Sequence, residues 1–468
     1  MSRLSGISLA LVITLAAVAV PAEAASNAVR VDLSRSMGAF PFSPGRQLSS
    51  IPKSWRYGTA ANAALDRLDL DQVRVWLKFG DAPEKSYDYL AAYATRSKSL
   101  LVNWQSSYSP LVTGGSFTEA ELFTAQRDTM ADYKRRFPSI EWLESENEVP
   151  SIADYYPMYR FTYRVVNAVN AMGLPGPKIK IGGPTTDIFS TRRIGQFLDL
   201  YAADQDPHKR LDFISYHQYL IDTSGDPAKW TDTKENPAAI ATERTQLNAM
   251  LAQRGLSPLP ALVSETGIFP RDRQTSLGLP ADLRIQAAAL ASMHYYYLGQ
   301  PQVTPFHWTV DHPENDRKDL FEDTATGAAL PYYNTMLMQS MLPKTRYAAA
   351  SDALSAQGLG VYGLAGAEPG RVAVMTWNYQ WTHQTTYQSK IVLTNFPSEF
   401  RTSNVLVTRY KIGSGALAPV EQFVIGPRTD GSYTSQTLEL QPNELRLLVL
   451  TPTTKPAGRG SAGPGSLR

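Results

Sequence analysis

The stretch Glu141-Trp-Leu-Glu-Ser-Glu-Asn-Glu148 begins like an apolar β-strand and ends in a series of carboxylates. If its residues alternate as they do in a strand, Glu144, Glu146 and Glu148 point to one face. Three carboxylates on one face are costly unless they reach a polar opening or find partners. Burial and mutual repulsion would raise the pKa of at least one, as a general acid requires. The alternative is an edge strand with solvated glutamates.

Other short segments rich in β-branched or aromatic residues surround this one, and longer helical patterns separate them. Such alternation is typical of βαβ units around a parallel sheet. The predicted strands are Gln72–Phe79, Leu100–Ser106, Ile140–Glu148, Lys178–Gly183, Leu211–Tyr219, Ala261–Thr266 and Thr304–Asp311. With a weak first strand near Met37–Phe40, they predict an α/β fold, a (β/α)8 TIM barrel. No G-x-G-x-x-G follows any of them, so a Rossmann sheet lacks its fingerprint.

The pattern changes near Arg346, where short strands alternate with turn residues. This change predicts a C-terminal antiparallel β-sandwich. We therefore expect the catalytic barrel over residues 25–345 and a sandwich accessory domain over residues 346–452. Residues 28–33, ahead of the barrel, are a candidate extra strand of the sandwich. The remaining residues, 453–468, are rich in Gly, Pro and Ser and are expected to be a disordered tail.

The N-terminus has the pattern of a targeting signal. Arg3 precedes the apolar run Ile7–Val20, and Ala22-Glu23-Ala24 is a small-x-small cleavage site. The run is short for a membrane span. Residues 1–24 are thus a predicted signal peptide, and the chain is expected to be secreted or periplasmic in a bacterium, with no membrane segment after cleavage. A retained N-terminal anchor is the alternative.

The composition excludes several classes of function. The net charge is only +2 and no basic block is present, so nucleic acid is not an expected partner. The chain has no cysteine, which rules out disulfides, thiolate nucleophiles and cysteine-bound metals. It has no G-x-S-x-G, and its histidines lack the H-E-x-x-H spacing. We predict no metal and no other cofactor; the oligomeric state stays open.

The predicted active site combines Glu148 with a second carboxylate. Glu265 ends the otherwise apolar strand that begins at Ala261. By itself Glu265 is explained equally well as a hydrogen-bonded buried residue. However, strands four and seven lie on opposite sides of an eight-stranded barrel, and active sites lie at the carboxyl ends of its strands. Two carboxyl groups that face each other across a sugar-sized gap are the apparatus of glycoside hydrolysis.

These residues resemble a known group of enzymes. Asn147-Glu148 after the fourth strand, with Glu265 ending the seventh, is similar to the pattern of the retaining (β/α)8 glycosidases. Within that clan the chain most resembles glycoside hydrolase family 39, which contains β-xylosidases, α-L-iduronidases and bacterial exopolysaccharide hydrolases. The matching segments are Glu144 four residues before Glu148, Lys180-Ile-Gly-Gly-Pro184 and Asp212-Phe-Ile-Ser-Tyr-His217-Gln-Tyr219.

The resemblance covers most of the mature chain and includes the C-terminal sandwich joined by an N-terminal strand. The chain also departs from the family pattern at three places. Glu146 stands where Trp is frequent, Val149 where Pro usually follows, and Thr266-Gly267 where Trp-Asn is usual.

The resemblance implies a role for each of the central residues. Glu265 would be the nucleophile, and Glu148 the acid in the first step and the base in the second. Retention of configuration requires the two carboxyl groups to lie about 5–5.5 Å apart. Asn147 would donate to the 2-hydroxyl of the sugar, and Glu144 would belong to the substrate-binding set.

The other predicted site residues have simpler alternatives. Arg74 would keep Glu265 ionised, or else form a structural ion pair inside the barrel. His217 and Tyr219 would donate to Glu265 or to the substrate, and a buried, hydrogen-bonded histidine is the competing interpretation. Trp308 would form the floor beneath the cleaved sugar and Trp104 would stack on sugar, although plain packing explains both equally well.

Together these features predict a retaining glycosidase with an oligosaccharide or polysaccharide substrate. The substrate would be β-xyloside-like or a related plant or bacterial polysaccharide. Two alternatives are a non-catalytic carbohydrate-binding protein on the same barrel and a component of polysaccharide export. The Glu148→Gln variant separates them, because a binding protein would keep its affinity and have no turnover to lose.

Overall fold

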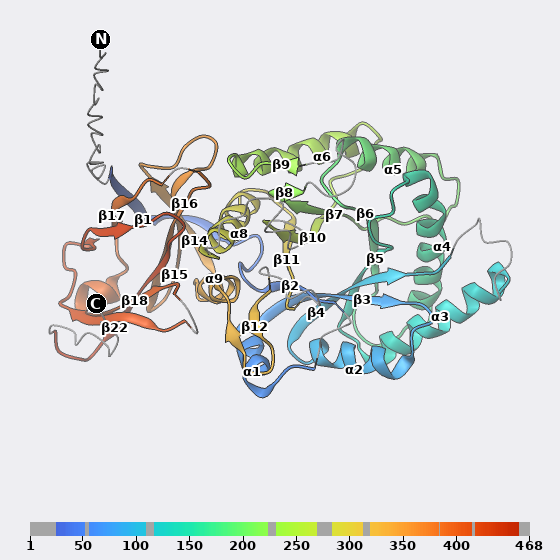
Figure 1. The fold of residues 1–468 in the computed structure, drawn as a ribbon, viewed down its shortest axis with the longest axis horizontal. Helices are drawn as coiled ribbons and strands as arrows, with labels where there is room; N and C mark the ends of the chain where they lie inside the picture. Colours follow the sequence, from blue (N-terminus) through green and yellow to red (C-terminus); the bar gives the residue numbers. More distant parts are fainter. Residues whose placement is uncertain are drawn as a thin grey trace, which may run out of the picture.

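The computed structural model describes residues 25–51, 56–108, 117–222, 231–268, 283–311, 319–382, 384–413 and 417–457. They form an α/β barrel with a curled β-sheet beside it (Figure 1). The predicted signal peptide lies outside the described residues, as does the predicted tail from residue 458 onward. Among the described helices, none combines the length and the apolar character needed to cross a membrane.

Eight strands close into a parallel barrel in the order β10-β11-β2-β3-β4-β5-β6-β7, which confirms the predicted (β/α)8 fold. Their bounds are β2 (Gln47–Ser49), β3 (Leu70–Lys78), β4 (Ser97–Gln105), β5 (Ile140–Ser145), β6 (Lys180–Thr186), β7 (Phe213–Tyr219), β10 (Ala261–Gly267) and β11 (Val303–Trp308). The first strand was predicted wrongly near Met37–Phe40. It is only three residues long and starts at Gln47, too short to produce a pattern in the sequence.

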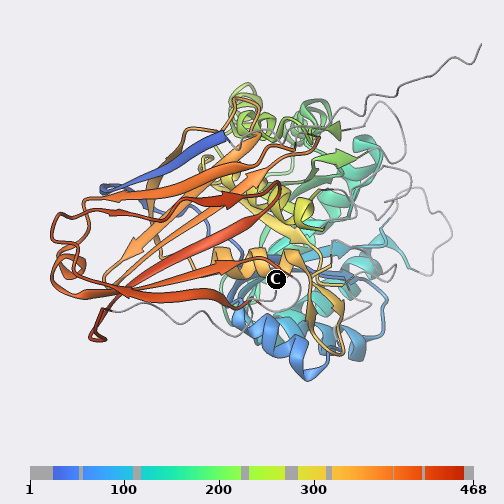
Figure 2. The same cartoon turned by 60° about the vertical axis from the view of Figure 1, so that its left-hand side comes forward.

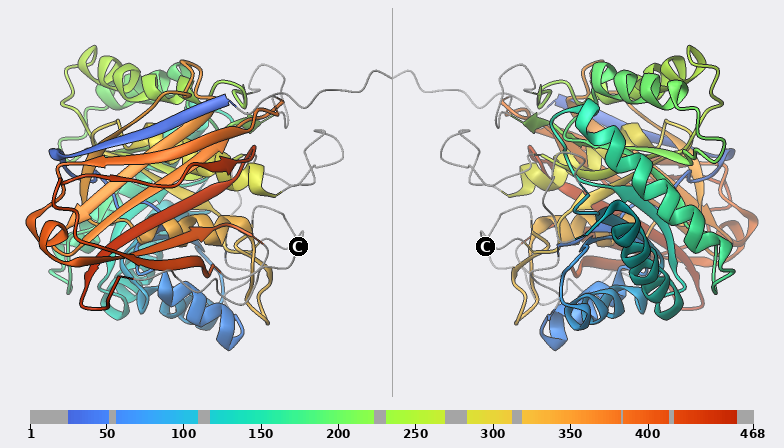
Figure 3. Two further views of the ribbon diagram at one scale, coloured as in Figure 1. Left: turned by 90° about the vertical axis from the view of Figure 1, so that its left-hand side faces the viewer. Right: turned by 90° about the vertical axis from the view of Figure 1, so that its right-hand side faces the viewer.

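Helices surround the barrel (Figure 3). They are α1 (Thr59–Arg67), α2 (Pro83–Ala94), α3 (Glu119–Arg136), α4 (Ile152–Ala171), α5 (Thr191–Ala203), the 3-10 helix η2 (Pro237–Thr242), α6 (Glu243–Ala252), α8 (Arg284–Tyr297) and α9 (Pro331–Ser340). Local chemistry sets their ends. At the start of α3, the Thr118 side chain accepts from the backbone of Glu121, whose carboxylate accepts from the Thr118 backbone in return. The outer hairpins β8 (Ile221–Asp222) with β9 (Thr231–Asp232), and β12 (Phe321–Asp323) with β13 (Ala328–Ala329), complete this part.

The C-terminal part is one curled ten-stranded sheet (Figure 2). Its strands are β1 (Ala25–Ala39), β14 (Thr345–Ser351), β15 (Gly360–Glu368), β16 (Arg371–Tyr379), β17 (Tyr387–Thr394), β18 (Asn404–Lys411), β19 (Pro419–Ile425), β20 (Tyr433–Thr434), β21 (Leu438–Leu440) and β22 (Leu445–Thr453), with the short helix α10 (Ser398–Thr402) between β17 and β18. Residues 28–33, the candidate extra strand, lie within β1. The pairing is antiparallel as predicted, except that β1 runs parallel to β17, so the sheet is mixed.

One face of this sheet packs directly on the barrel. Trp377 of β16 is fully buried, stacks on Tyr362 of β15 and donates from Nε1 to the Ser292 hydroxyl of α8 at 2.9 Å. Apolar residues of α8 and of β16 belong to the same buried cluster. The shared core joins the sheet and the barrel.

Close packing of β6 explains the two glycines of Lys180-Ile-Gly-Gly-Pro184. A Cβ atom on Gly182 would lie 2.3 Å from the Phe213 carbonyl oxygen, and one on Gly183 would lie 2.0 Å from the Tyr155 hydroxyl. Both positions therefore require glycine for β7 and α4 to approach β6. This contact places β7, which carries His217 and Tyr219, in register beside β6.

Candidate active site

The chain changes direction just after β5, in the segment that carries Glu146 and Glu148. β5 ends at Ser145, and Glu146 and Glu148 both have positive φ, at 55° and 51°. The predicted alternation of three carboxylates on one face is therefore wrong, because it holds only as far as the strand does. A positive φ costs energy for a residue that has a side chain, so tertiary contacts must hold these two residues in this conformation.

Two hydrogen bonds fix this reversal. Asn103 of β4 donates from Nδ2 to the carbonyl oxygen of Glu146 at 2.6 Å, and the Glu148 amide donates to the Thr185 carbonyl at 3.0 Å. The role of Asn103 in aiming the loop after β5 depends on the register of β4 and β5, which the sequence does not give.

Glu146 turns away from Glu148 toward β4. Its carboxylate accepts from the backbone amide of Ser106 at 2.8 Å and from the Ser106 hydroxyl. Burial raises the pKa of Glu146, although these hydrogen bonds act in the opposite direction. The raised pKa expected in this segment thus occurs at Glu146, which is held by the backbone and hydroxyl of Ser106.

Glu265 is 4% exposed and both of its oxygens have a donor. Arg74 Nη1 donates to Oε1 at 2.7 Å, and the Tyr219 hydroxyl donates to Oε2 at 2.6 Å. Arg74 comes from the second barrel strand and Tyr219 from the sixth. Three strands far apart in the sequence therefore fix one carboxylate at the carboxyl end of the barrel.

Arg74 connects three acceptors while being fully buried. Besides Glu265, its Nε donates to Glu144 and its Nη2 donates to Asn147 Oδ1 at 2.8 Å. Burial lowers the pKa of Arg74, but the charges of Glu144 and Glu265 raise it more, so the guanidinium remains charged. Asn147 keeps its Nδ2 as a donor for a ligand while its oxygen is held by Arg74.

Glu144 lies beneath Arg74 and not at the surface of the site. It is fully buried and also accepts from Asn103 Nδ2 at 3.1 Å. The expectation that Glu144 contacts substrate does not fit this burial, because its side chain has no exposed surface and contacts Arg74 and Asn103. Its contacts give it a positioning role for Arg74.

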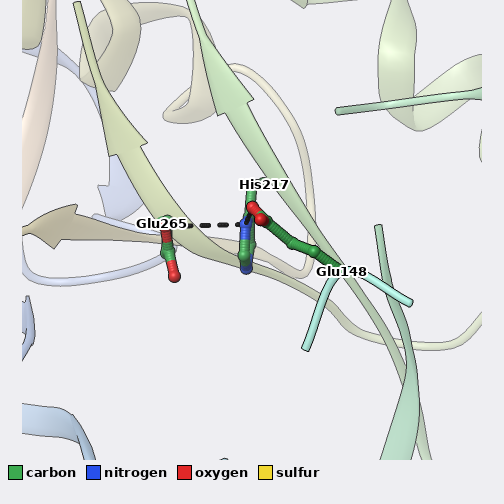
Figure 4. Close-up of side chains that lie close together, drawn as sticks. All are labelled: Glu148, His217 and Glu265. Atoms are coloured by element: carbon green, nitrogen blue, oxygen red, sulfur yellow. Dashed lines mark hydrogen bonds and ion pairs between the residues drawn. The ribbon is translucent and has the colours of Figure 1, made fainter. Parts of the chain in front are cut away.

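His217 lies between Glu148 and Glu265 (Figure 4). Its Nδ1 is 2.7 Å from Glu148 Oε1 and 3.5 Å from Glu265 Oε2. Burial lowers the pKa of His217, but the charge of Glu265 and the hydrogen bond to Glu148 raise it more, so the net shift is upward. The Glu148 side chain is 39% exposed, in contrast to 6% for that of Glu265.

The two carboxylates are close enough to act on one bond. An oxygen of Glu148, an oxygen of Glu265 and a His217 nitrogen all lie within 4.8 Å of one another. Inverting glycosidases keep their carboxyl groups about 6.5–9.5 Å apart, and retaining ones about 5–5.5 Å. The nearest oxygens of Glu148 and Glu265 are thus no more than 4.8 Å apart, so both carboxylates reach the same point at the mouth of the barrel.

These three side chains are also the only group among the described residues whose donors are near enough to share a metal ion. A metal would have to replace the proton between His217 Nδ1 and Glu148 Oε1, which are at hydrogen-bond distance of 2.7 Å. These two atoms are already paired with each other by this hydrogen bond.

The predicted aromatic residues occupy different positions. Trp308, at the end of β11, is 6% exposed and clusters with Tyr219 and with Trp76, whose ring is 5.8 Å from its own. Trp76 lies two residues after Arg74 on the same face of β3, and its ring is 4.9 Å from the guanidinium carbon. Trp76 was not among the predicted site residues, although its spacing of two from Arg74 places it on the same face of the strand.

Trp104 faces the helices and not the site. It is 1% exposed, donates to Gln126 of α3 at 2.9 Å and packs on Tyr133. The expectation that Trp104 stacks on a sugar is wrong. Asn103 points into the barrel, so its neighbour in the strand must point outward.

With this geometry established, the chain can be compared with known proteins. No protein-family model and no curated protein matches it. Solved structures do match. The fold is that of known glycoside hydrolases. The GH39 enzyme from Xanthomonas axonopodis pv. citri is 16% identical with a TM-score of 0.70, over 93% of this chain and 100% of the other.

Two further solved glycosidases are similar to the chain over nearly the same length. The glucosidase from Croceicoccus marinus is 14% identical with a TM-score of 0.68, over 92% of this chain and 100% of the other. The monomeric β-xylosidase from Caulobacter crescentus CB15 is 13% identical with a TM-score of 0.65, over 91% and 99%. The similarity to GH39 and related TIM-barrel glycosidases is thus structural, extends over nearly the whole chain and exists at low sequence identity.

Proposed function

We propose that the protein is a retaining glycoside hydrolase, similar to family 39, that cleaves O-glycosidic bonds by double displacement. The observation that carries this proposal is the approach of Glu148 and Glu265 to within 4.8 Å, with His217 between them, at the carboxyl end of a closed barrel. Similarity of fold to solved glycosidases supports the reaction class, but the roles below rest on the environment of each carboxylate.

Glu265 fits the role of nucleophile. The nucleophile must be ionised and held rigidly, because attack requires one oxygen aligned with the anomeric carbon. The Arg74 guanidinium and the Tyr219 hydroxyl fix both oxygens, and only 6% of the side chain is exposed. In the proposed first step, Glu265 forms a bond to the anomeric carbon as the bond from that carbon to the leaving oxygen breaks.

Glu148 fits the role of acid and base. It is the more exposed of the pair and accepts or shares a hydrogen bond with His217. In the first step it gives its proton to the leaving oxygen, and in the second it takes a proton from the water that releases the sugar from Glu265. Asn147, held through its oxygen by Arg74, would donate to the sugar 2-hydroxyl.

The proposed substrates are β-xyloside-like glycosides or a related plant or bacterial polysaccharide. One of the similar structures is named as a β-xylosidase and another as a glucosidase, which supports a pyranoside substrate without choosing the sugar. The proposal also includes export to the periplasm or the outside after removal of residues 1–24. N-terminal sequencing of the protein from its native host would test the cleavage.

The test is a screen of 4-nitrophenyl glycosides with three matched variants. Glu148→Gln and Glu265→Gln change the proposed pair, and Glu141→Gln is the control. Glu141 lies in the same strand region but pairs with Lys180 on the outside of the barrel. Hydrolysis that survives Glu141→Gln and is lost in both other variants supports the proposal. Turnover by all three, or by none including the wild type, would contradict it.

A further inference from the structure

The curled sheet contains a cavity of about 390 Å³ that belongs to no part of the barrel. Residues of β16, β17, β18, β19, β22 and the β20–β21 region line it. Small-molecule sites have volumes of about 300–1,000 Å³, whereas well-packed sheet interiors leave few voids larger than a water molecule. A hollow of this size between the two halves of a sheet therefore needs an explanation.

The interior of the sheet changes from apolar to polar at this end. Val372, Leu450 and Val407 are cross-strand neighbours in the buried apolar cluster. Two pairs further along the same face of β22, Arg446 stands between Thr376 of β16 and Lys411 of β18. All three residues line the cavity. Because polar groups are costly inside a sandwich, this change indicates a surface that is meant to meet a polar ligand.

The charges at the cavity are unequal. Three cations line it, Arg409, Lys411 and Arg446, against one lining carboxylate, Glu421. Glu421 pairs with Arg409. The buried Glu444 lies behind the lining and pairs with both Lys411, at 3.1 Å, and Arg446. Counting Glu444, one positive charge remains, which a single carboxylate on a ligand would balance.

The rest of the lining suits a sugar ring. Ile391, Leu440 and Leu448 give an apolar wall for the C–H face of a pyranose. Ser389, whose Oγ accepts from Asn27 Nδ2 at 3.0 Å, has its hydroxyl hydrogen to donate to a hydroxyl group of the sugar. The cavity is also accessible, since the side chain of Lys411 is 40% exposed and Val420 at its edge is 54% exposed. A ligand with both an apolar ring face and one acid group matches this combination.

We infer that the curled sheet holds a second carbohydrate-binding site, specific for a sugar residue that carries a carboxylate, a hexuronate. The site would anchor an acidic polysaccharide to the protein independently of cleavage. This inference goes beyond the proposed function, because it concerns binding in the sheet and not bond cleavage in the barrel.

Two matched probes test the inference by isothermal titration calorimetry. Methyl β-D-glucuronoside and methyl β-D-glucoside differ only in a carboxylate and a hydroxymethyl group. The wild-type protein is expected to bind the glucuronoside about tenfold more tightly, the value of one charge-assisted hydrogen bond. The preference should fall with added salt, because surface charges are screened.

Variants assign this preference to the cavity. Lys411→Gln and Arg446→Gln, each made alone, should reduce the preference to about onefold to threefold. Lys390→Gln is the control, since Lys390 is an exposed cation beside Ser389 on the opposite face of β17. Ser389→Trp would fill the cavity and should abolish binding of both probes there, and thermal melting would verify that each variant is folded.

A double variant, Glu148→Gln with Glu265→Gln, separates this inference from the proposed function. The sheet site should bind the glucuronoside equally well in this variant, whether or not the wild type has turnover. Equal affinity of the wild type for both probes would overturn the inference. So would a preference that survives Lys411→Gln and Ser389→Trp, or that disappears only when the barrel carboxylates are changed.

Discussion

The ends of β5 and β10 each present a glutamate to the same opening, yet they do so by different means. Glu265 lies within its strand, almost fully buried, with a donor on each oxygen. Glu148 lies three residues beyond its strand, on backbone with positive φ, more exposed and bonded to His217. The difference teaches that residue type fixes the chemistry available, while in the proposed mechanism the two environments suit one carboxylate to attack and the other to proton exchange.

The largest expected effect separates the two carboxylates directly. Glu265→Gln should lower kcat by about 10⁴-fold or more on every substrate, because no covalent intermediate forms. Glu148→Gln should lower kcat/KM by about 10²–10⁴-fold on glycosides with poor leaving groups, and by much less on a 2,4-dinitrophenyl glycoside, because kcat/KM reports the first step and this leaving group departs without an acid. Steady-state kinetics on both substrate types checks this. Equal losses in the two variants, whatever the leaving group, would remove the distinction between them.

The next effect concerns what fixes Glu265. Arg74→Met should reduce the free energy of unfolding by about 3–5 kcal/mol, because it leaves Glu144 and Glu265 as buried carboxylates without their cation. The control is Arg30→Met, which breaks the exposed pair of Arg30 with Asp352 and should cost less than about 1 kcal/mol. Urea unfolding followed by circular dichroism measures both. Similar costs would show that Arg74 is not the anchor of the site.

Tyr219→Phe should have a smaller effect on the same carboxylate. It removes one hydrogen bond, of 2.6 Å, and leaves the ring packed near Trp308. We expect kcat/KM to fall about tenfold while Glu148-dependent discrimination between leaving groups is retained. A change in leaving-group dependence instead would mean that Tyr219 acts on the acid and not on the nucleophile.

The smallest effect is a pH dependence at His217, between the two carboxylates. The folded-state pKa of His217 is raised above its ordinary value of 6.5. Its stabilising contribution is therefore complete below about pH 6.5 and is lost as the pH rises through the raised pKa. His217→Gln should give a flatter dependence of unfolding free energy on pH above 6.5. An unchanged slope would indicate that His217 is neutral throughout.

The sequence predicted the barrel well because buried parallel strands are apolar runs of ordinary length. It could not locate β2, since three residues carry no pattern, and it missed the parallel pairing of β1 with β17, which depends on contacts 362 positions apart, as between Asn27 and Ser389. In both cases the missing information was tertiary.

For the candidate site, too, the sequence was informative where residues follow the pattern of a regular strand and uninformative where tertiary contacts decide. Motif residues such as Glu265, Arg74 and Tyr219 lie in regular strands, and the structure brings them together. Glu146 was placed wrongly because the strand period was extended past Ser145 into backbone of positive φ. Trp104 could have been excluded from the sequence, because neighbouring residues of a strand point to opposite faces and Asn103 points inward. The same alternation places Trp76 on the face of Arg74.

The most direct test of the account is the stereochemistry of the first product. Hydrolysis of the best aryl glycoside is followed by proton NMR from the first seconds, before mutarotation mixes the anomers. Attack by Glu265 and then by water inverts the anomeric carbon twice, so the first sugar released should have the configuration of the substrate. Release of the opposite anomer would contradict the assignment of Glu265 as nucleophile and of Glu148 as its acid/base partner.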